Sequence, residues 1–364
     1  MPTTNVQHSA DFSGQNFYCG IDVHKRSWTV TIRSLGLQVG YFTQPPCAED
    51  LAQHLRSRFP GGNFYSVYEA GYFGTGPHER LCSLGIHNLI VNPADIPATD
   101  KQRKTKTDLH DSRALAEYLE KDELKGIYIM ERSQQELRSL FRLRLCKSKD
   151  LTQAINRLKG FLSYFGIPLP GNWDRFAYLS REALRALSNL ELSSQAGTLC
   201  LQEHLRDVLE RRRCLLETTR QLRTLVQEKF AGSYRCLVSI PGIGPITAVA
   251  LLAEVGDFSR FRTPRQFASF LGLMPWENSS GESTSTKGIQ PRCNHYLRPL
   301  LIEAGWSALR RSPELLLYYR RHALRNSKKA IVKVAHKLAL SARAVVLHQQ
   351  PYDPAHRHWS VTTN

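Results

Sequence analysis

The chain has 364 residues and is 41% hydrophobic and 22% charged, which is enough for about two or three globular domains. Lys and Arg outnumber Asp and Glu by 49 to 32, and the formal net charge of +17 favours a polyanionic partner over a merely basic soluble protein. No segment approaches the roughly 20 apolar residues of a membrane-spanning helix. Eight scattered cysteines without a Cys-x-x-Cys pair indicate reduced thiols in a cytosol and argue against a zinc ribbon or a disulfide framework.

The N-terminal third has the pattern of an α/β layer. Residues 1–15 are polar and are predicted to form a disordered tail. Residues 16–130 then alternate short β-branched or apolar runs with helical patterns and a glycine-rich loop at 71–77. The predicted strands cover residues 17–22, 28–32, 38–42, 64–69 and 87–91, and the predicted helices cover residues 51–59 and 81–84.

Acidic residues occupy special places in this layer. Asp22 and Glu69 each end an apolar run that is predicted to be a buried strand, and Asp108 and Asp111 lie three residues apart after the N-cap candidate Thr107. Carboxylates at two strand ends and one helix start are a common way to hold divalent metal ions over a phosphodiester. For the two helical aspartates the alternative is simple matching of the helix dipole.

A long helical region follows the α/β layer. Residues 133–165 carry an apolar stripe among many Arg and Lys, and a second helical stretch spans residues 173–230, with breaks predicted near Ser188 and Gly197. The spacing predicts an antiparallel coiled-coil arm over residues 131–232. The pattern leaves open whether the arm pairs within one chain or between two chains.

The C-terminal region, residues 233–348, is predicted to be mainly helical and to bind nucleic acid, and residues 349–364 are predicted to be a tail. A Pro-Gly-Ile-Gly turn at 241–244 resembles a helix-hairpin-helix turn, whose glycines let backbone amides approach a phosphate; a plain tight connection is the alternative. Arg and Lys interleave with Tyr and Trp after residue 295, which favours phosphate contact and stacking over a solvated helix face. The candidate nucleic-acid-binding residues are Lys104, Lys106, Gly242, Gly244, Lys287, Arg298, Arg320, Arg321, Lys328 and Lys329.

A Ser- and Gly-rich stretch at residues 278–288 has the composition of a flexible surface linker. A serine in such a stretch acts as a nucleophile only if another group activates it. Composition does not distinguish Ser280 from Ser279. His24 and His110 also deserve testing, because they neighbour the carboxylates in the chain.

Several motifs, taken in order, resemble those of the DEDD insertion-sequence transposases, the IS-one-ten family that includes the Piv-type pilin-inversion recombinases. The later motifs look closest to the IS-eleven-eleven subgroup. One departure is Cys293, where the family usually has Gly before the Asn of a late Gly-Asn motif. The matching stretches are residues 20–23, 68–71, 106–116, 240–244, 267–275, 279–282 and 297–306.

The resemblance implies an α/β plus α fold: a RuvC-like N-terminal domain of the RNase H fold, a coiled-coil arm and a mainly helical transposase domain. It implies that Asp22, Glu69, Asp108 and Asp111 bind Mg²⁺, and that Ser280 attacks the scissile phosphate and becomes covalently linked to DNA. Implied partners are a structured non-coding guide (bridge) RNA, target and donor double-stranded DNA, and further copies of the chain, as dimers that assemble into tetramers. Implied localisation is the prokaryotic cytoplasm, at the nucleoid.

Two other functions fit the same residues. A RuvC-like structure-selective DNA nuclease would use the carboxylates to activate water and would need no serine. A non-catalytic nucleic-acid-binding protein would keep the acidic residues for structural reasons only.

Overall fold

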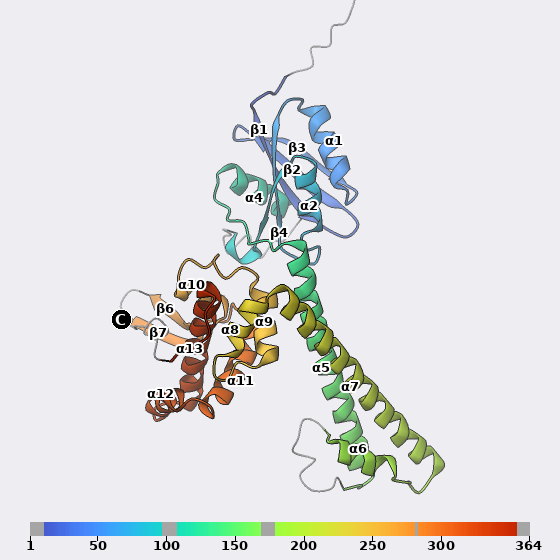
Figure 1. The fold of residues 1–364 in the computed structure, drawn as a ribbon. Helices are drawn as coiled ribbons and strands as arrows, with labels where there is room; N and C mark the ends of the chain where they lie inside the picture. Colours follow the sequence, from blue (N-terminus) through green and yellow to red (C-terminus); the bar gives the residue numbers. More distant parts are fainter. Residues whose placement is uncertain (1–10, 97–107, 169–178, 281–282, 355–364) are drawn as a thin grey trace, which may run out of the picture. The chain divides into compact units, whose positions relative to one another are not determined.

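The computed structural model describes residues 11–96, 108–168, 179–280 and 283–354, with the side chains of residues 108–110, 277–280 and 283–287 outside that description. The chain divides into two compact units, Met1–Ile129 and Met130–Asn364 (Figure 1). Within the described residues, no helix has the length and apolar character needed to cross a membrane.

The first unit is built on a mixed five-stranded sheet with the strand order β3-β2-β1-β4-β5. Strand β1 pairs antiparallel with β2 and parallel with β4, so it forms the centre of the sheet. All five predicted strands are confirmed: four have slightly wider bounds, and the fifth has the predicted bounds. The strands are β1 Asn16–Val23, β2 Trp28–Ser34, β3 Leu37–Gln44, β4 Asn63–Glu69 and β5 His87–Val91.

Helices cover both faces of this sheet. Alternate residues of β1 point to opposite sides: one side packs on helices α1 and α2, and the other side packs on α4. Apolar residues on the two faces therefore make two separate clusters. This mixed α/β arrangement is the one expected for an RNase H-like domain. The helices are α1 Ala48–Arg58, α2 Gly76–Ser83 and α4 Asp108–Glu120, with a 3₁₀ turn η1 at Pro93–Asp95.

Two local expectations for this unit differ from the structure. The ring of Phe12 makes edge contacts with Phe17 and Phe59, at centroid distances of 5.6 and 5.4 Å, so residues 11–15 belong to the packed unit and not to a tail. Helix α2 begins at Gly76, inside the stretch expected to be a loop, because Pro77 occupies the first turn, where its missing N–H costs nothing.

The second unit begins with two long helices, α5 (Arg132–Tyr164) and α7 (Gln195–Lys229), joined through the short helix α6 (Arg181–Ser188). Helices α5 and α7 lie side by side within the chain (Figure 1). Their direction follows from the cross-helix bonds: Arg144 donates to Thr219, Lys147 to Thr218 and Arg157 to Asp207. Because partner numbers fall along α7 as they rise along α5, the two helices are antiparallel.

The sequence predicted helix breaks near Ser188 and near Gly197, and the structure has one interruption between these two residues. Gly197 lies inside α7, and its amide N donates to the side chain of Ser194, the N-cap residue, at 3.1 Å. A capping serine starts a helix by satisfying an otherwise unpaired amide. The interruption between α6 and α7 therefore falls at residues 189–194.

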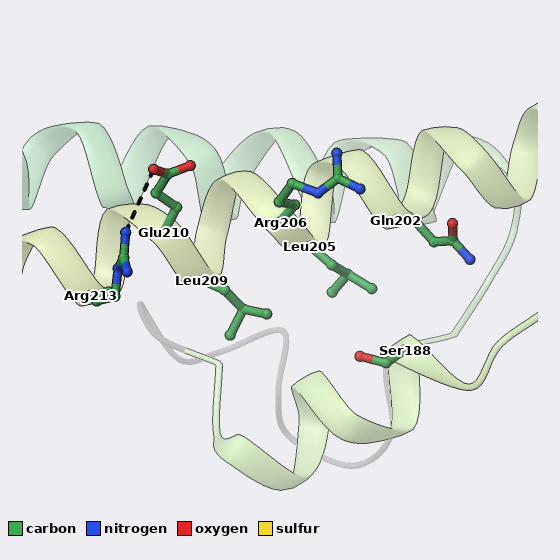
Figure 2. Close-up of a pocket in the computed structure, with 7 residues that line it drawn as sticks. All are labelled: Ser188, Gln202, Leu205, Arg206, Leu209, Glu210 and Arg213. Atoms are coloured by element: carbon green, nitrogen blue, oxygen red, sulfur yellow. Dashed lines mark ion pairs between the residues drawn. The ribbon is translucent and has the colours of Figure 1, made fainter.

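A cavity of about 530 Å³ lies beside α6 and α7 (Figure 2). Among its lining residues Glu210 is the one carboxylate, and it lies 4.0 Å from Arg213 in an ion pair. This cavity therefore lacks the clustered carboxylates that metal-assisted phosphate chemistry requires. Its lining residues are Ser188, Gln202, Leu205, Arg206, Leu209, Glu210 and Arg213.

The rest of the second unit packs around α9 (Pro245–Val255), which is buried over nearly its whole length. The stretch expected to be a flexible Ser-rich loop is instead a two-stranded hairpin, because alternating Ser and Thr suit a pleated strand. The remaining elements are α8 Ala231–Val238, α10 Pro264–Phe270, β6 Pro275–Ser280, β7 Ser283–Ile289, α11 Leu297–Leu309, α12 Pro313–Ala323 and α13 Ser327–His348.

Candidate active site

Parallel pairing of β1 and β4 brings two of the predicted carboxylates together. Ile21 is the register partner of Tyr68, and Asp22 and Glu69 are the next residues along these neighbouring strands. Both therefore lie at the carboxyl ends of neighbouring parallel strands. The Asp22 side chain is 19% exposed, so it is reachable from solvent although its strand is buried.

Helix α4 supplies a third carboxylate because it lies very close to β1. A β-carbon on Gly20 would lie 2.0 Å from the carbonyl oxygen of Ser112, so only glycine allows this approach. The hydroxyls of Ser112 and Thr31 form a buried hydrogen bond of 2.9 Å, which holds the helix against β2. Asp111 directly precedes Ser112 and is thus fixed by the same contacts.

The far end of α4 is also fastened to the sheet. Arg33 donates from its Nε to Glu120 at 2.8 Å, and the amide of Gly36 donates to the other oxygen of Glu120 at 2.7 Å. Nearer the middle, Arg113 donates to the side chain of Gln38 at 2.9 Å. These bonds fix the rotation of α4 about its own axis, and this rotation decides which side Asp111 faces.

Asp22, Glu69 and Asp111 line one cavity of about 310 Å³ in the first unit. Asp108 is the first residue of α4, but its side chain lies outside the described residues. The cavity thus collects three of the four predicted carboxylates. The remaining lining residues are Ile21, Val23, His24, Ala70, Gly71, Tyr72, Phe73 and Leu115.

Carboxylate oxygens are hard ligands of the kind that divalent cations such as Mg²⁺ prefer. Among the described side chains, no three His, Cys, Asp or Glu groups are close enough together to hold a metal ion by themselves. The donor set therefore fits a divalent cation in its chemistry. Closing a coordination shell would require side-chain adjustment, waters, substrate phosphate or Asp108.

Of the two histidines singled out in the sequence, His24 lines this cavity, and the side chain of His110 lies outside the described residues. Nε2 of His24 lies 3.0 Å from Oδ2 of Asp22, and the His24 side chain is half exposed. His24 belongs to the turn between β1 and β2, where its amide donates to the carbonyl of Ser27 at 3.1 Å. The contact holds the Asp22 carboxylate beside an imidazole that lines the same cavity.

The loop after β4 is held over the cavity by Tyr68. Its hydroxyl donates to the carbonyl of Gly74 at 2.9 Å and accepts the amide of His78 at 3.2 Å. Burial raises the pKa of the Tyr68 phenol, so it stays neutral and can act as donor. Tyr72 in this loop is 92% exposed, which puts an aromatic ring at the rim of the cavity.

The predicted nucleophile lies in the other unit. Ser280 is the last residue of β6, and its backbone is the register partner of Ser283 at the tip of the hairpin. Its side chain, like that of Lys287, lies outside the described residues. The carboxylates belong to the first unit and Ser280 to the second.

The base of this hairpin is closed by bonds that the sequence did not reveal. The amide of Gln290 donates to the carbonyl of Met274 at 3.0 Å. Arg298, predicted to bind nucleic acid, is half buried and donates to the carbonyls of Gln290 at 2.7 Å and Gly272 at 3.4 Å. Arg298 thus has internal partners, and its contact with nucleic acid stays a prediction.

The two glycines of the 241–244 turn have different surroundings. Gly242 is buried with a φ of +92°, and a β-carbon there would lie 2.4 Å from the carbonyl oxygen of Ala304 on α11. Its absence of a side chain therefore serves helix packing. Gly244 has open space around it at the start of α9, so it is the turn glycine with room for a phosphate.

Helices α12 and α13 carry the exposed basic residues. Arg320, Arg321, Lys328 and Lys329 are all exposed, as predicted for phosphate contacts. Aromatic rings lie among them: Lys337 sits over the ring of Tyr318 at 4.4 Å. Partial burial and the neighbouring cations lower the pKa of His322 on the same surface. Lys104 and Lys106 lie outside the described residues.

Two family models match different parts of the chain. Residues 19–166 match the DEDD transposase model of IS110-type elements, and residues 234–320 match the Transposase IS116/IS110/IS902 family. The first match contains Asp22, Glu69, Asp108 and Asp111, and the second contains Ser280. The two matches together cover most of the chain.

Individual relatives agree with these models. A putative transposase of Sinorhizobium fredii, y4qE, is 28% identical over 80% of this chain and 71% of its own length. A probable family 20 transposase of Pseudomonas aeruginosa is 30% identical over 56% of this chain and 60% of its own length. The transposase of insertion sequence element IS1111A from Coxiella burnetii is 28% identical over 64% of this chain and 62% of its own length. The chain therefore belongs to the IS110 family of DEDD transposases, and it is a DNA transposase.

Proposed function

We propose that this transposase is an RNA-guided recombinase that cuts and rejoins DNA through a covalent phosphoserine at Ser280, with Mg²⁺ held by Asp22, Glu69, Asp108 and Asp111. The observation that carries the proposal is the shared cavity of Asp22, Glu69 and Asp111 at the strand ends of the first unit. Family membership adds the serine-containing region of the second unit.

The chemistry exchanges one phosphodiester for another. The Oγ of Ser280 forms a bond to phosphorus while the bond between phosphorus and a sugar oxygen breaks, and the serine proton passes to a carboxylate or to water. The released sugar oxygen takes up a proton. In the rejoining step, the hydroxyl of another DNA end attacks the phosphoserine and restores Ser280. Mg²⁺, when bound, supplies charge neutralisation at the phosphate oxygens and lowers the pKa of the attacking hydroxyl.

A guide RNA would supply the sequence specificity, so the protein needs to recognise mainly backbone and shape. The exposed cations on α12 and α13 and the formal net charge of +17 would serve such contacts with the nucleic-acid backbone. Target and donor DNA would both pair with the RNA.

We further propose that α5 and α7 form the coiled-coil arm of a dimer and that dimers assemble into tetramers. In this assembly the carboxylates of one subunit act with Ser280 of another.

The direct test is covalent trapping. Wild-type protein, DNA and RNA transcribed from the region flanking the reading frame are incubated with Mg²⁺, and protein–DNA adducts are resolved on a denaturing gel. Ser280→Ala should abolish the adduct while RNA and DNA binding persist, and Ser279→Ala should retain it. An adduct that survives Ser280→Ala, or one that forms equally without RNA, would contradict the proposal.

A structure-selective nuclease is the second candidate, because three carboxylates line a cavity within the first unit alone. Such an enzyme would attack the phosphate with water and leave free ends. Cleavage of branched DNA by Ser280→Ala at the wild-type rate, without any trapped adduct, would favour this candidate.

A further inference from the structure

Glu254 is a buried carboxylate of the second unit and is not one of the acidic residues of the cavity in the first unit. It lies near the end of α9, and its side chain is 1% exposed. Arg142 of α5 donates to both of its oxygens, from Nε at 2.7 Å and from Nη2 at 2.8 Å. The guanidinium also lies over the ring of Tyr296 at 4.4 Å, so its plane is fixed from two directions.

Asn294 joins this ion pair to the start of α11. Its Nδ2 donates to Oε2 of Glu254 at 3.0 Å. Its Oδ1 accepts the amides of Tyr296 at 3.0 Å and Leu297 at 2.9 Å. Its own amide donates to the carbonyl of Phe270 at 2.9 Å, at the end of α10. One residue thus ties α9, α10 and α11 together.

The same connection continues to the serine hairpin. The amide of Arg298 donates to the carbonyl of Asn294 at 3.2 Å, in the first turn of α11. The Arg298 guanidinium then holds the carbonyl of Gln290, the residue that follows β7. A continuous series of bonds therefore runs from Arg142 on α5 through Glu254, Asn294 and Arg298 to the hairpin that carries Ser280.

Core packing alone does not require a charged pair at this place. Burying a carboxylate is unfavourable, and a well-packed apolar side chain often stabilises a core equally well. A bidentate pair between arginine and a carboxylate instead fixes direction, because both groups are planar and meet in one geometry. A misplacement of about 1 Å at a reacting group is enough to cost roughly 100-fold in rate.

We infer that Glu254, held between Arg142 and Asn294, is a positioning residue that sets the serine hairpin for attack on the phosphate. The inference rests on the proposed function of Ser280. It assigns to α5, the helix that directly follows the first unit in the chain, a bonded connection to the base of the hairpin.

The discriminating variant is Asn294→Asp. It keeps an acceptor for the amides of Tyr296 and Leu297, so the start of α11 is retained, but it puts a second carboxylate against Glu254. At saturating DNA and RNA, we expect the single-turnover rate of adduct formation to fall at least about tenfold, with the dissociation constant for DNA unchanged.

Arg144→Gln is the matched control. Arg144 is two residues from Arg142 on α5 and donates to Thr219 of α7, outside the series of bonds. This variant should lower the thermal stability and leave the adduct rate unchanged. Asn294→Asp should also lower the thermal midpoint, because it puts two carboxylates side by side in a buried place. Its rate and that of Arg144→Gln are therefore compared at a temperature at which both variants are fully folded, so that a loss of stability by itself leaves the rate unchanged.

The outcomes distinguish the phosphoserine mechanism from the positioning role of Glu254. No adduct with the wild-type protein would overturn the phosphoserine mechanism and the inference with it. A wild-type adduct together with an unchanged rate in Asn294→Asp would overturn the inference alone. If Asn294→Asp does not fold, Arg142→Lys replaces it, because lysine keeps the charge and loses the bidentate geometry, and the same fall in rate at unchanged DNA affinity is required.

Discussion

Gly20 on β1 and Ser112 on α4 are in direct backbone contact: a β-carbon on Gly20 would lie 2.0 Å from the carbonyl oxygen of Ser112 and 2.5 Å from the amide of Ala116. This approach decides where Asp111 sits, because Asp111 precedes Ser112 on the same turn. The carboxylate cavity therefore depends on a residue that carries no functional group.

Gly20→Ala should displace α4 from the sheet. Backbone atoms cannot yield as a flexible side chain can, so the variant is expected to lose about 1–3 kcal/mol of unfolding free energy, the usual range for overpacking. Urea unfolding measures this loss. DNA cleavage should fall much more steeply than the folded fraction does, because Asp111 leaves its position beside Asp22 and Glu69.

Gly160→Ala is the control for this variant. A β-carbon at Gly160 meets nothing within 4 Å, and the residue lies inside helix α5, where alanine is favourable. Stability should stay at or slightly above the wild-type level, and cleavage should stay at the wild-type level. Equal cleavage by Gly20→Ala and Gly160→Ala would show that the position of α4 does not limit the reaction.

The buried bond between Thr31 and Ser112 permits a double-mutant cycle. Each side chain is fully buried, and their hydroxyls lie 2.9 Å apart. Thr31→Val or Ser112→Ala alone should cost about 1–3 kcal/mol, because the remaining hydroxyl stays buried and has lost this bond, whereas the double variant should cost less than the sum. Additive losses in chemical denaturation would mean that the bond contributes little.

Much of the fold follows from local sequence patterns. The alternation of β1 to β5 and the apolar character of α9 were sufficient to predict these elements, because hydrophobic periodicity reports which face is buried. Asp22 and Glu69 were identified by their place at strand ends. The parallel pairing that makes them neighbours needed the three-dimensional structure.

Contacts between distant segments could not be predicted from such patterns. The sequence patterns assigned Gly20 no steric role and predicted that Gly242 approaches a phosphate, and only the neighbouring helix shows why a side chain is excluded at each. Arg298 belongs to a basic segment, so composition suggested phosphate as its partner, whereas the folded chain offers it two backbone carbonyls. Pairings that span long stretches of chain leave no periodic signal.

Gly272 and Cys293 form a second steric pair. Gly272 has a φ of +67°, and a β-carbon there would lie 2.2 Å from Cβ of Cys293. Gly272→Ala should therefore destabilise the hairpin base by more than the roughly 1 kcal/mol of its left-handed backbone alone. Adding Cys293→Gly should relieve the clash, but adding Cys293→Ala should not, because alanine retains the offending atom. Thermal unfolding midpoints of the three variants measure this order.

The salt dependence of DNA binding should separate Arg298 from the exposed arginines. Arg320→Ala should reduce the slope of log K against log salt by about 1, as expected for the loss of one phosphate contact. Arg298→Ala should leave the slope unchanged and lower the thermal stability, because it removes bonds to Gly272 and Gln290. Equal slope changes in the two variants would place Arg298 at the nucleic acid.

Acid sensitivity of the second unit should arise in part at His336 on α13. Burial lowers the pKa of His336 below its usual value of 6.5. As the pH falls through 6.5, His336 takes up a proton in the unfolded chain but not yet in the folded chain. The free energy of unfolding contributed by His336 is therefore lost on acidification and is constant at higher pH. His336→Gln cannot take up this proton. Its unfolding free energy should therefore vary less than that of the wild type between about pH 7.5 and pH 5.5, when each is measured by urea titration. If the two proteins lose stability equally over this range, groups other than His336 carry the acid sensitivity.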